Sequence, residues 1–202
     1  MRIGILGTGH VAGLLATAWQ KAGHDVTLGS RDPKSKQLDF AVDTLNGAAD
    51  VAQVIVNAVV GAEAVETMAG MDQTVTRGKT VIDVTNAVTP EFLPVYPNSS
   101  VAQELQTILP EARVVKTMNT AAMTLMVNPK SIGPSSVFVS GNDADAKMQV
   151  RDLLGDLGWS PDSVVDLGGV ETASAAEKYF YLFAGLAGVL QTEQFNIRVV
   201  RA

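Results

Sequence analysis

The sequence predicts an α/β fold: a doubly wound, mostly parallel sheet followed by a C-terminal helical appendage. Short runs rich in β-branched residues alternate with helical stretches from the first residue to about residue 167, as in repeated βα units. Apolar residues make up 47% of the chain but aromatic residues only 5%, so aliphatic side chains must build the core, as is typical of α/β proteins. After Gly168 and Gly169, an Ala-rich helical pattern runs to about Asn196 with no further strand.

These patterns give an expected order of elements and two regions. The expected strands lie at residues 2–6, 25–28, 53–59, 79–84, 113–117, 136–140 and 164–166, with a weaker one near 40–45. The expected helices lie at residues 10–22, 62–69, 101–109 and 144–157, with Ser99 or Ser100 and Asn142 or Asp143 as N-caps. Residues 1–167 would form the nucleotide-binding domain, and residues 168–202 a helical segment for packing and dimerisation.

Composition argues against several classes of function. A net charge of −6 disfavours broad contact with nucleic acid or an anionic membrane. With no cysteine and two histidines, we expect neither disulfides nor a metal site. The first residues lack the features of a secretory signal, so we expect a cytoplasmic protein. The longest apolar run, residues 179–190, is too short to span a bilayer and is interpreted as a buried helix.

A glycine-rich turn follows the first expected strand. Residues 7–12 read GTGHVA, a G-x-G-x-x-A pattern that opens a helix. In a Rossmann unit, Gly7 would permit the tight turn, Gly9 would let a pyrophosphate approach the backbone, and Ala12 would let the helix pack closely on the sheet. The unpaired N–H groups and partial positive charge of the helix start would then face the phosphates. The turn therefore predicts dinucleotide binding.

The residues after the second strand favour NADP(H) over NAD(H). An NAD enzyme usually places an acid about 20 residues past the turn to hold the ribose hydroxyls, and here Ser30 occupies that position. Arg31 follows, with Lys34 and Lys36 close behind, and hydroxyl and guanidinium groups suit a 2′-phosphate. The alternative is a solvated basic loop in which Asp32 serves as a displaced acid.

Four segments together resemble a known family. GTGHVA at 7–12, AGHDV at 22–26, GSR at 29–31 and GNDADA at 141–146 resemble the NADP reductases that depend on the deazaflavin coenzyme F420. The nucleotide-binding module is also similar to the cytosolic domain of the six-transmembrane ferric reductases. The likeness covers nearly the whole chain and is densest in residues 1–31 and 136–177.

The resemblance implies roles for individual residues. It places Thr8, Gly9, His10 and Val11 on the pyrophosphate and ribose, and Ser30 and Arg31 on the 2′-phosphate. It also implies that two strand ends surround the nicotinamide: Ala58, Val59 and Val60 at one, and Thr85, Asn86 and Ala87 at the other. These strand-end positions agree with the general location of ligands in parallel sheets.

The sequence departs from the family on the acceptor side. The archaeal F420 enzymes have a histidine where this chain has Asn119, and prolines where it has Val60 and Ala122. They also have an arginine where it has Ser174, ahead of the matching Glu177. These differences leave the residues expected to hold NADP unchanged and concern the hydride acceptor.

The expected chemistry needs no strong acid. Hydride transfer between two rings depends mainly on positioning, whereas reduction of a ketone must protonate an alkoxide. No side chain stands out as that donor: His10 lies in the phosphate turn, and His24 is interpreted as a structural turn residue. Lys116, near a strand end, is interpreted as reaching solvent rather than donating a proton.

One segment supplies candidates for the acceptor pocket. Asn119 is the preferred polar residue there, because polar groups at strand ends of open α/β sheets tend to face the ligand. Met118, Met123 and Met126 cluster around it and would form either an adaptable wall for a planar ring or part of the core.

Three functions are compatible with the sequence. The first is an NADPH-dependent oxidoreductase acting on F420, a flavin or a similar planar acceptor. The second is a small-molecule dehydrogenase or imine reductase, and the third is a non-catalytic NADP(H) sensor. The C-terminal segment has apolar residues at helical spacing, predicted to pack on the sheet and in a homodimer, or within the chain only: Tyr179, Phe180, Phe183, Leu186, Val189 and Leu190.

Overall fold

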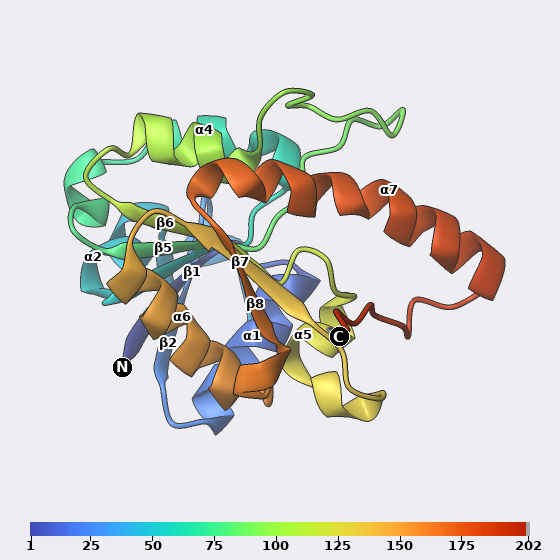
Figure 1. Ribbon diagram of the computed structural model, residues 1–202. Helices are drawn as coiled ribbons and strands as arrows, with labels where there is room; N and C mark the ends of the chain where they lie inside the picture. Colours follow the sequence, from blue (N-terminus) through green and yellow to red (C-terminus); the bar gives the residue numbers. More distant parts are fainter. Residues whose placement is uncertain (201–202) are drawn as a thin grey trace.

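An eight-stranded sheet in the order β3-β2-β1-β4-β5-β6-β7-β8 forms the centre of the computed structural model, which describes residues 1–200 (Figure 1). Its strands are β1 (Arg2–Leu6), β2 (Asp25–Ser30), β3 (Ala41–Thr44), β4 (Val54–Asn57), β5 (Thr80–Asp83), β6 (Arg113–Thr117), β7 (Val137–Gly141) and β8 (Val164–Gly168). Neighbouring strands are parallel except β6 and β7. The predicted mostly parallel, Rossmann-type sheet is therefore confirmed.

Helices cover both faces of this sheet. They are α1 (His10–Lys21), α2 (Leu45–Val51), α3 (Ala64–Ala69), α4 (Val101–Ile108), α5 (Met123–Val127), α6 (Ala144–Asp156) and α7 (Ala173–Leu190). Helices α1, α5 and α6 lie on one face, where Leu15, Trp19 and Leu153 belong to one buried cluster. Helices α2, α3 and α4 lie on the other, where Met68 and Leu105 belong to a second cluster.

The four helices expected before residue 168 are present, and their caps explain where two of them begin. The Ser100 hydroxyl accepts a hydrogen bond from the Gln103 N–H at 3.1 Å, and the Asp143 carboxylate accepts one from the Ala146 N–H at 2.7 Å. The second residue of each expected pair is thus the cap. Helices α2 and α5 were not expected, because seven and five residues are too few to show a helical period.

The order in which the chain adds strands to the sheet changes sides between β1 and β4. Strands β2 and β3 lie on one side of β1, and β4 lies on the other, so the carboxyl ends of β1 and β4 border a crevice. Gly7 leaves β1 with φ +123°, and a Cβ there would lie 2.5 Å from the Ala58 carbonyl oxygen. Only glycine permits this turn beside β4, as predicted.

The C-terminal helix is shorter and less buried than predicted. It ends at Leu190, where Gln191 adopts a left-handed conformation, rather than continuing to Asn196. The residues that follow are mostly polar, so no apolar face remains to hold a helix against the sheet. The chain returns to β7 instead, where the Ser136 N–H donates to the Ile197 carbonyl oxygen at 2.8 Å.

The prediction of a buried helix over residues 179–190 is wrong. None of those residues is buried, and the buried positions of α7 are Ala173 and Ala176, near its start. The far half of α7 extends beyond the edge of the sheet (Figure 1), although Phe183 within it packs, half-buried, against the core cluster that contains Leu15. No helix within residues 1–200 has both the length and the hydropathy needed to cross a bilayer.

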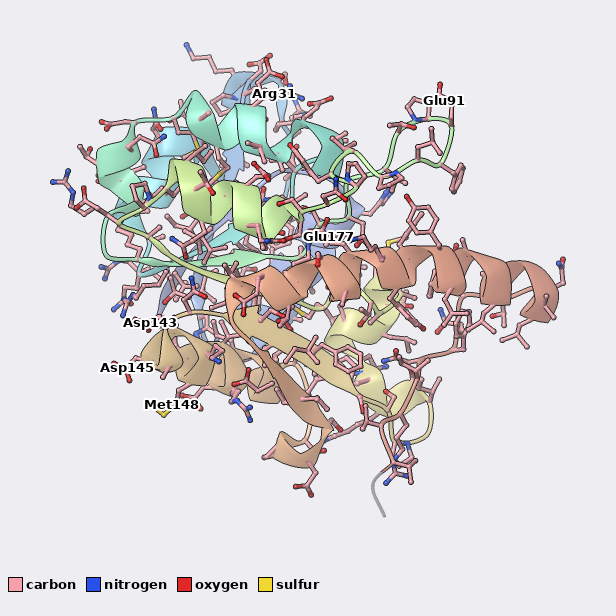
Figure 2. All side chains as sticks on the ribbon, turned by 45° about the horizontal axis from the view of Figure 1, so that its top comes forward. Arg31, Glu91, Asp143, Asp145, Met148 and Glu177 are labelled. Carbon is pink, nitrogen blue, oxygen red and sulfur yellow. The ribbon has the colours of Figure 1, made fainter. Side chains whose placement is uncertain are left out.

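Lys116 is buried rather than solvated, which corrects its interpretation. Its side chain is 1% exposed, and its ammonium donates to Asp83 and to Glu177 at 2.7 Å each, and also to the Thr85 carbonyl oxygen. Glu177 in addition accepts from the Val101 N–H at 2.8 Å, at the point where α7 passes α4 (Figure 2). Two carboxylates thus compensate a charge that lysine seldom buries alone.

We predict that Lys116→Met destabilises the protein by about 3–5 kcal/mol at neutral pH, because two buried carboxylates lose their cation. Burial already raises the pKa of Glu177 above its ordinary value, although the neighbouring ammonium opposes this. A carboxyl with a raised folded-state pKa favours the folded protein when protonated, so the loss of stability should become smaller as the pH falls. Urea unfolding at several pH values measures this loss of stability. The control is Lys178→Met, at an exposed position of α7 next to Glu177, which should change stability little.

Candidate functional site

Two adjacent pockets lie along the carboxyl ends of the strands, with volumes of about 350 and 330 Å³. We call the first the glycine pocket, because it contains the Gly7–Gly9 turn, and the second the amide pocket, because Asn86 and Asn119 line it. Ala58 and Val59, just beyond β4, line both pockets. The pockets therefore form one continuous groove of the size that small-molecule ligands occupy.

The glycine pocket combines the start of α1 with the end of β2. A Cβ added at Gly9 would meet no atom within 4 Å, so the backbone there faces open space. Helix α1 begins after Gly9 with no side-chain cap, which leaves the N–H groups of its first turn available to an anion. The pocket is lined by Gly7, Thr8, Gly9, Gly29, Ser30, Arg31, Asp32, Ser35, Lys36, Leu45, Ala58, Val59, Val60, Glu63 and Thr67.

The residues expected at a 2′-phosphate meet at one end of the glycine pocket. Ser30 is 6% exposed, and its hydroxyl accepts from the Asp32 N–H at 3.1 Å. The Arg31 guanidinium is 75% exposed and lies 3.2 Å from a carboxylate oxygen of Glu63 (Figure 2). An exposed pair of this kind is weak, so an incoming anion can compete for the guanidinium. Asp32 lines the same pocket, and its position leaves the alternative acid role open.

Some predicted residues lie elsewhere in the groove or outside it. Lys36 lines the glycine pocket, whereas Lys34 is exposed and lines neither of the two pockets. His10 and Ala87 also lie outside both lining sets, and Val11 lines the amide pocket instead of the glycine pocket. Sequence reasoning did not single out Glu63, because nothing local indicates that α3 begins beside Arg31.

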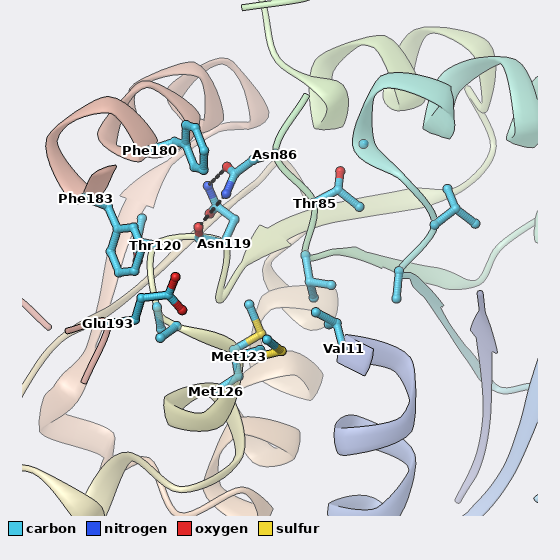
Figure 3. A pocket seen from close by; sticks show the side chains of 16 residues that line it. Val11, Thr85, Asn86, Asn119, Thr120, Met123, Met126, Phe180, Phe183 and Glu193 are labelled. Atoms are coloured by element: carbon cyan, nitrogen blue, oxygen red, sulfur yellow. Dashed lines mark hydrogen bonds between the residues drawn. The ribbon is translucent and has the colours of Figure 1, made fainter. Parts of the chain in front are cut away.

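Two side-chain amides organise the amide pocket. The Asn119 side chain donates to the Asn86 side-chain oxygen at 2.9 Å, and the Asn86 side chain donates to the Asn119 carbonyl oxygen at 2.8 Å (Figure 3). Asn119 follows Met118, which is buried and has φ +61°, an uncommon conformation that turns the chain sharply after β6. The two bonds join the ends of β5 and β6 at the base of the pocket.

Thr85 links this pocket to the buried lysine. Its N–H and hydroxyl donate to Asp83 at 3.2 and 2.8 Å, and its carbonyl oxygen accepts from Lys116. Asp83 also accepts from the Asn57 side chain at 2.9 Å. Lys116 does not line the pocket, so its ammonium group is not placed to donate a proton to a ligand there. It instead fixes the end of β5 through Asp83 and the Thr85 carbonyl oxygen.

The C-terminal segment supplies the far wall of the amide pocket. Phe180 and Phe183 of α7 line it, and so does Glu193 from the segment that follows (Figure 3). Phe195 stacks on Phe183 with ring centroids 4.9 Å apart, which brings the chain beyond α7 back to the pocket. The sequence analysis assigned Phe180 and Phe183 to packing. They share this pocket with Asn119, more than 60 residues earlier in the chain, and so distant a neighbour leaves no local pattern in the sequence.

Met123 and Met126 line the amide pocket, as the wall hypothesis expected. Met118 belongs to the core, and so does Met126. Thr120 also lines the pocket and was missed. Its position beside Asn119 at the end of β6 was the available indication, because strand-end polar residues tend to face the ligand.

Comparison with known proteins decides the family. Residues 2–87 match the sequence profile of the family described as NADP oxidoreductase, coenzyme F420-dependent. The whole chain superposes on a crystal structure from Arthrobacter sp. FB24, assigned as an F420-dependent NADP reductase, with a TM-score of 0.92, 37% identity and 100% coverage of both chains. The chain belongs to the F420-dependent NADP oxidoreductase family.

More distant relatives share part of their length with this chain. Rat metalloreductase STEAP3 is 29% identical over 180 residues, which cover 87% of this chain and 36% of that protein, so the chain spans about a third of that relative. The reductive aminase from Aspergillus terreus, solved in complex with NADPH and ethyl-5-oxohexanoate, is 22% identical with a TM-score of 0.69 over 94% of this chain and 62% of the other. The latter likeness shows the fold alone.

The four positions at which the sequence departs from the archaeal F420 enzymes lie in different places. Asn119 and Ala122 both line the amide pocket, and Val60 lines the glycine pocket. Ser174 lies outside both lining sets. Two of the four differences therefore change the lining of the amide pocket.

Proposed function

We propose that this oxidoreductase transfers hydride between NADPH and a planar acceptor such as F420 or a flavin. The observation that carries the proposal is the continuity of the groove: the glycine and amide pockets meet at Ala58 and Val59. One extended nucleotide can therefore reach from an anion-binding helix start to an apolar pocket. In the amide pocket it would face space walled by Phe180 and Phe183.

The residues present fit NADP(H). The open backbone at Gly9 and the uncapped start of α1 suit a pyrophosphate, with Thr8 beside it. Val11 would lie further along the bound nucleotide, in the amide pocket, and His10 lines neither pocket. Ser30 and Arg31 suit the 2′-phosphate, with the charges of Lys34 and Lys36 nearby. The nicotinamide would lie between the two strand ends that carry Ala58, Val59 and Val60, and Thr85, Asn86 and Ala87. When bound, NADPH supplies the hydride, and water supplies the proton that completes the reduction.

The amide pocket suits a ring better than a ketone. Among residues 1–200, no histidine, lysine or tyrosine lines it, and Glu193 is its one ionisable side chain, so a single carboxyl group is the only acid available to an alkoxide. Asn119 and Asn86 would orient the edge of a ring by hydrogen bonds, while Met123 and Met126 adapt to its face. Holding two rings in contact is itself a large part of catalysis.

We expect Arg31→Ala to weaken NADPH binding about 10- to 100-fold and to leave NADH binding nearly unchanged, because only the 2′-phosphate loses charge-assisted hydrogen bonds. Calorimetric titration with each nucleotide measures this. Glu63→Gln should act in the opposite direction and tighten NADPH about two- to fivefold, because it frees the guanidinium from a weak surface pair.

Glu66→Gln provides the control. It removes the same charge about one helical turn from Glu63, at a residue that does not line the glycine pocket. Equal affinity of the unaltered protein for NADPH and NADH would contradict the assignment of Ser30 and Arg31. It would favour Asp32 as the residue that holds the ribose.

The proposed reaction is tested by following NADPH oxidation at 340 nm with F420, FMN, riboflavin or a ferric chelate. We expect turnover with at least one planar ring, faster than with simple ketones. NADPH binding without turnover of any acceptor would instead identify a nucleotide sensor. Preferential turnover of ketones or imines would identify a small-molecule dehydrogenase or imine reductase.

We also propose that the protein is a homodimer through the outer half of α7. Leu182, Val189 and Leu190 are 57%, 81% and 51% exposed, on a helix that extends beyond the sheet (Figure 1). The resemblance to the family implies a dimer, and two copies of one apolar helix face can cover each other about a two-fold axis.

Light scattering at micromolar concentration should therefore give the mass of a dimer. The double substitution Leu182→Asp and Val189→Asp should give a folded monomer, because charges replace apolar contacts. Val51→Asp, at another exposed position on α2, should leave the dimer intact. A monomeric unaltered protein would reject this assembly.

A further inference from the structure

The two side-chain amides of the amide pocket fix each other's orientation. The Asn119 carbonyl oxygen can only accept a hydrogen bond, so the Asn86 atom that lies 2.8 Å from it must be the side-chain nitrogen. The Asn86 side-chain oxygen then lies 2.9 Å from the Asn119 side chain and requires a nitrogen there. Turning either amide over would bring two oxygen atoms together. The Asn119 side-chain oxygen is therefore the one amide atom that this pair of hydrogen bonds leaves unused.

That oxygen is unpaired without being sealed inside the protein. None of the hydrogen bonds among residues 1–200 includes it. Four side-chain polar atoms of the described residues are both fully enclosed and unpaired, and the Asn119 oxygen is not one of them. Asn119 is 6% exposed and lines the amide pocket. Such an oxygen can be hydrated in the free protein and can accept a hydrogen bond from a ligand that displaces the water.

A fixed amide oxygen distinguishes between ligand edges. An N–H group at the edge of a ring can donate to it, whereas a ring edge that carries only carbonyl oxygens, as in a quinone, would bring two acceptors together. The walls around it are largely apolar and include Phe180, Phe183, Met123 and Met126, so a ligand that fills the pocket would displace water from the oxygen. An acceptor left unpaired in this way lowers affinity.

The sheet order places Asn119 on the acceptor side of the groove. Strand β1 leads into the glycine turn, and β4, β5 and β6 follow it across the sheet in that order. The end of β6 is therefore farther from the turn than the ends of β4 and β5, between which the nicotinamide is proposed to lie. Figure 3 shows Asn119 on the side of Phe180, with Val11 across the pocket.

We infer that the Asn119 side-chain oxygen accepts a hydrogen bond from a ring N–H of the hydride acceptor. The pocket then selects planar heteroaromatic rings with an N–H at the edge, such as the imide of a flavin or deazaflavin, over quinones. Asn86 acts through Asn119 as a positioning residue, because its amide keeps that oxygen turned toward the ring. The inference rests on the proposed function and narrows its acceptor class.

The reaction leaves this hydrogen bond in place. The oxidised ring accepts one hydride from NADPH and one proton from water, so NADPH and a proton are consumed and NADP⁺ and the two-electron-reduced ring are formed. The imide N–H of a flavin is present in both redox states, so the same contact holds substrate and product. Asn119 therefore contributes binding and orientation, and it transfers no proton.

Riboflavin and 3-methylriboflavin provide a matched pair of probes, because a methyl group replaces the imide hydrogen in the second. Each is titrated by flavin fluorescence into the full protein saturated with NADP⁺. We expect riboflavin to bind about three- to tenfold more tightly than its methylated form. Asn119→Leu should weaken riboflavin by a similar factor and leave 3-methylriboflavin nearly unchanged. A general disturbance of the pocket would instead weaken both flavins equally.

The positioning role is tested with Asn86→Leu. Without its partner, the Asn119 amide can turn either its oxygen or its nitrogen toward the ligand, so we expect the preference for riboflavin over 3-methylriboflavin to fall. Asn98→Leu is the matched control, at an exposed asparagine that does not line the pocket, and it should keep the full preference. A preference that survives Asn86→Leu unchanged would contradict the positioning role.

The nicotinamide carboxamide is the other N–H donor within the groove, and a second pair of probes separates it from the acceptor. NADP⁺ and its 3-acetylpyridine analogue differ in the amide N–H. We expect Asn119→Leu to leave the affinities for both nucleotides unchanged. Weaker binding of NADP⁺ with unchanged binding of the analogue would overturn the inference and assign the oxygen to the nicotinamide.

The remaining outcomes separate this inference from the proposed function. Equal affinity of the unaltered protein for the two flavins, or equal weakening of both in Asn119→Leu, would overturn the inference. Tighter binding of the quinone menadione than of riboflavin, or binding of NADP⁺ but of neither flavin, would also overturn it while leaving NADP(H) dependence intact. Failure to bind NADP⁺ at all would contradict the proposed function itself.

Discussion

A buried ammonium group joins the C-terminal helix to the sheet, and the amide pocket depends on this contact. Lys116 on β6 contacts Asp83 on β5 and Glu177 on α7, and it also holds the Thr85 carbonyl oxygen. Phe180 follows Glu177 by almost one helical turn, so anchoring Glu177 determines where the aromatic wall lies. An ion pair buried this deeply contributes little net stability, which favours a role in placing α7.

The groove divides into two halves with different origins. The glycine half comes from consecutive residues of one β-turn-α unit and the end of the next strand, and its binding groups are mainly backbone N–H groups and a short basic loop. The amide half collects residues from α1, α5 and α7, from the loops that follow β4, β5 and β6, and from the segment after α7. Substitutions in the amide half can therefore change the ligand accepted there while the glycine half stays the same. The departures at Asn119 and Ala122 lie in the amide half.

Local patterns predicted most of the scaffold for a physical reason. Strands buried on both faces appear as continuous apolar runs, and helices such as α1 and α6 are long enough to show their period and their caps. The same logic selected Gly7, Gly9, Ser30 and Arg31 as candidates, because a phosphate site at a helix start is built from near neighbours in sequence. Short elements such as α2 and α5 gave no such pattern and were missed.

The sequence by itself determined the parallel sheet, the nucleotide turn and the basic group expected at the 2′-phosphate, since each depends on residues close together in the chain. The tertiary structure decided what long-range contacts control: that Lys116 is buried by two carboxylates, that α7 stops at Leu190, and that Phe183 and Glu193 line the same pocket as Asn119. A charged side chain is buried or solvated according to its spatial partners, and no local pattern specifies partners that lie 33 and 61 residues away.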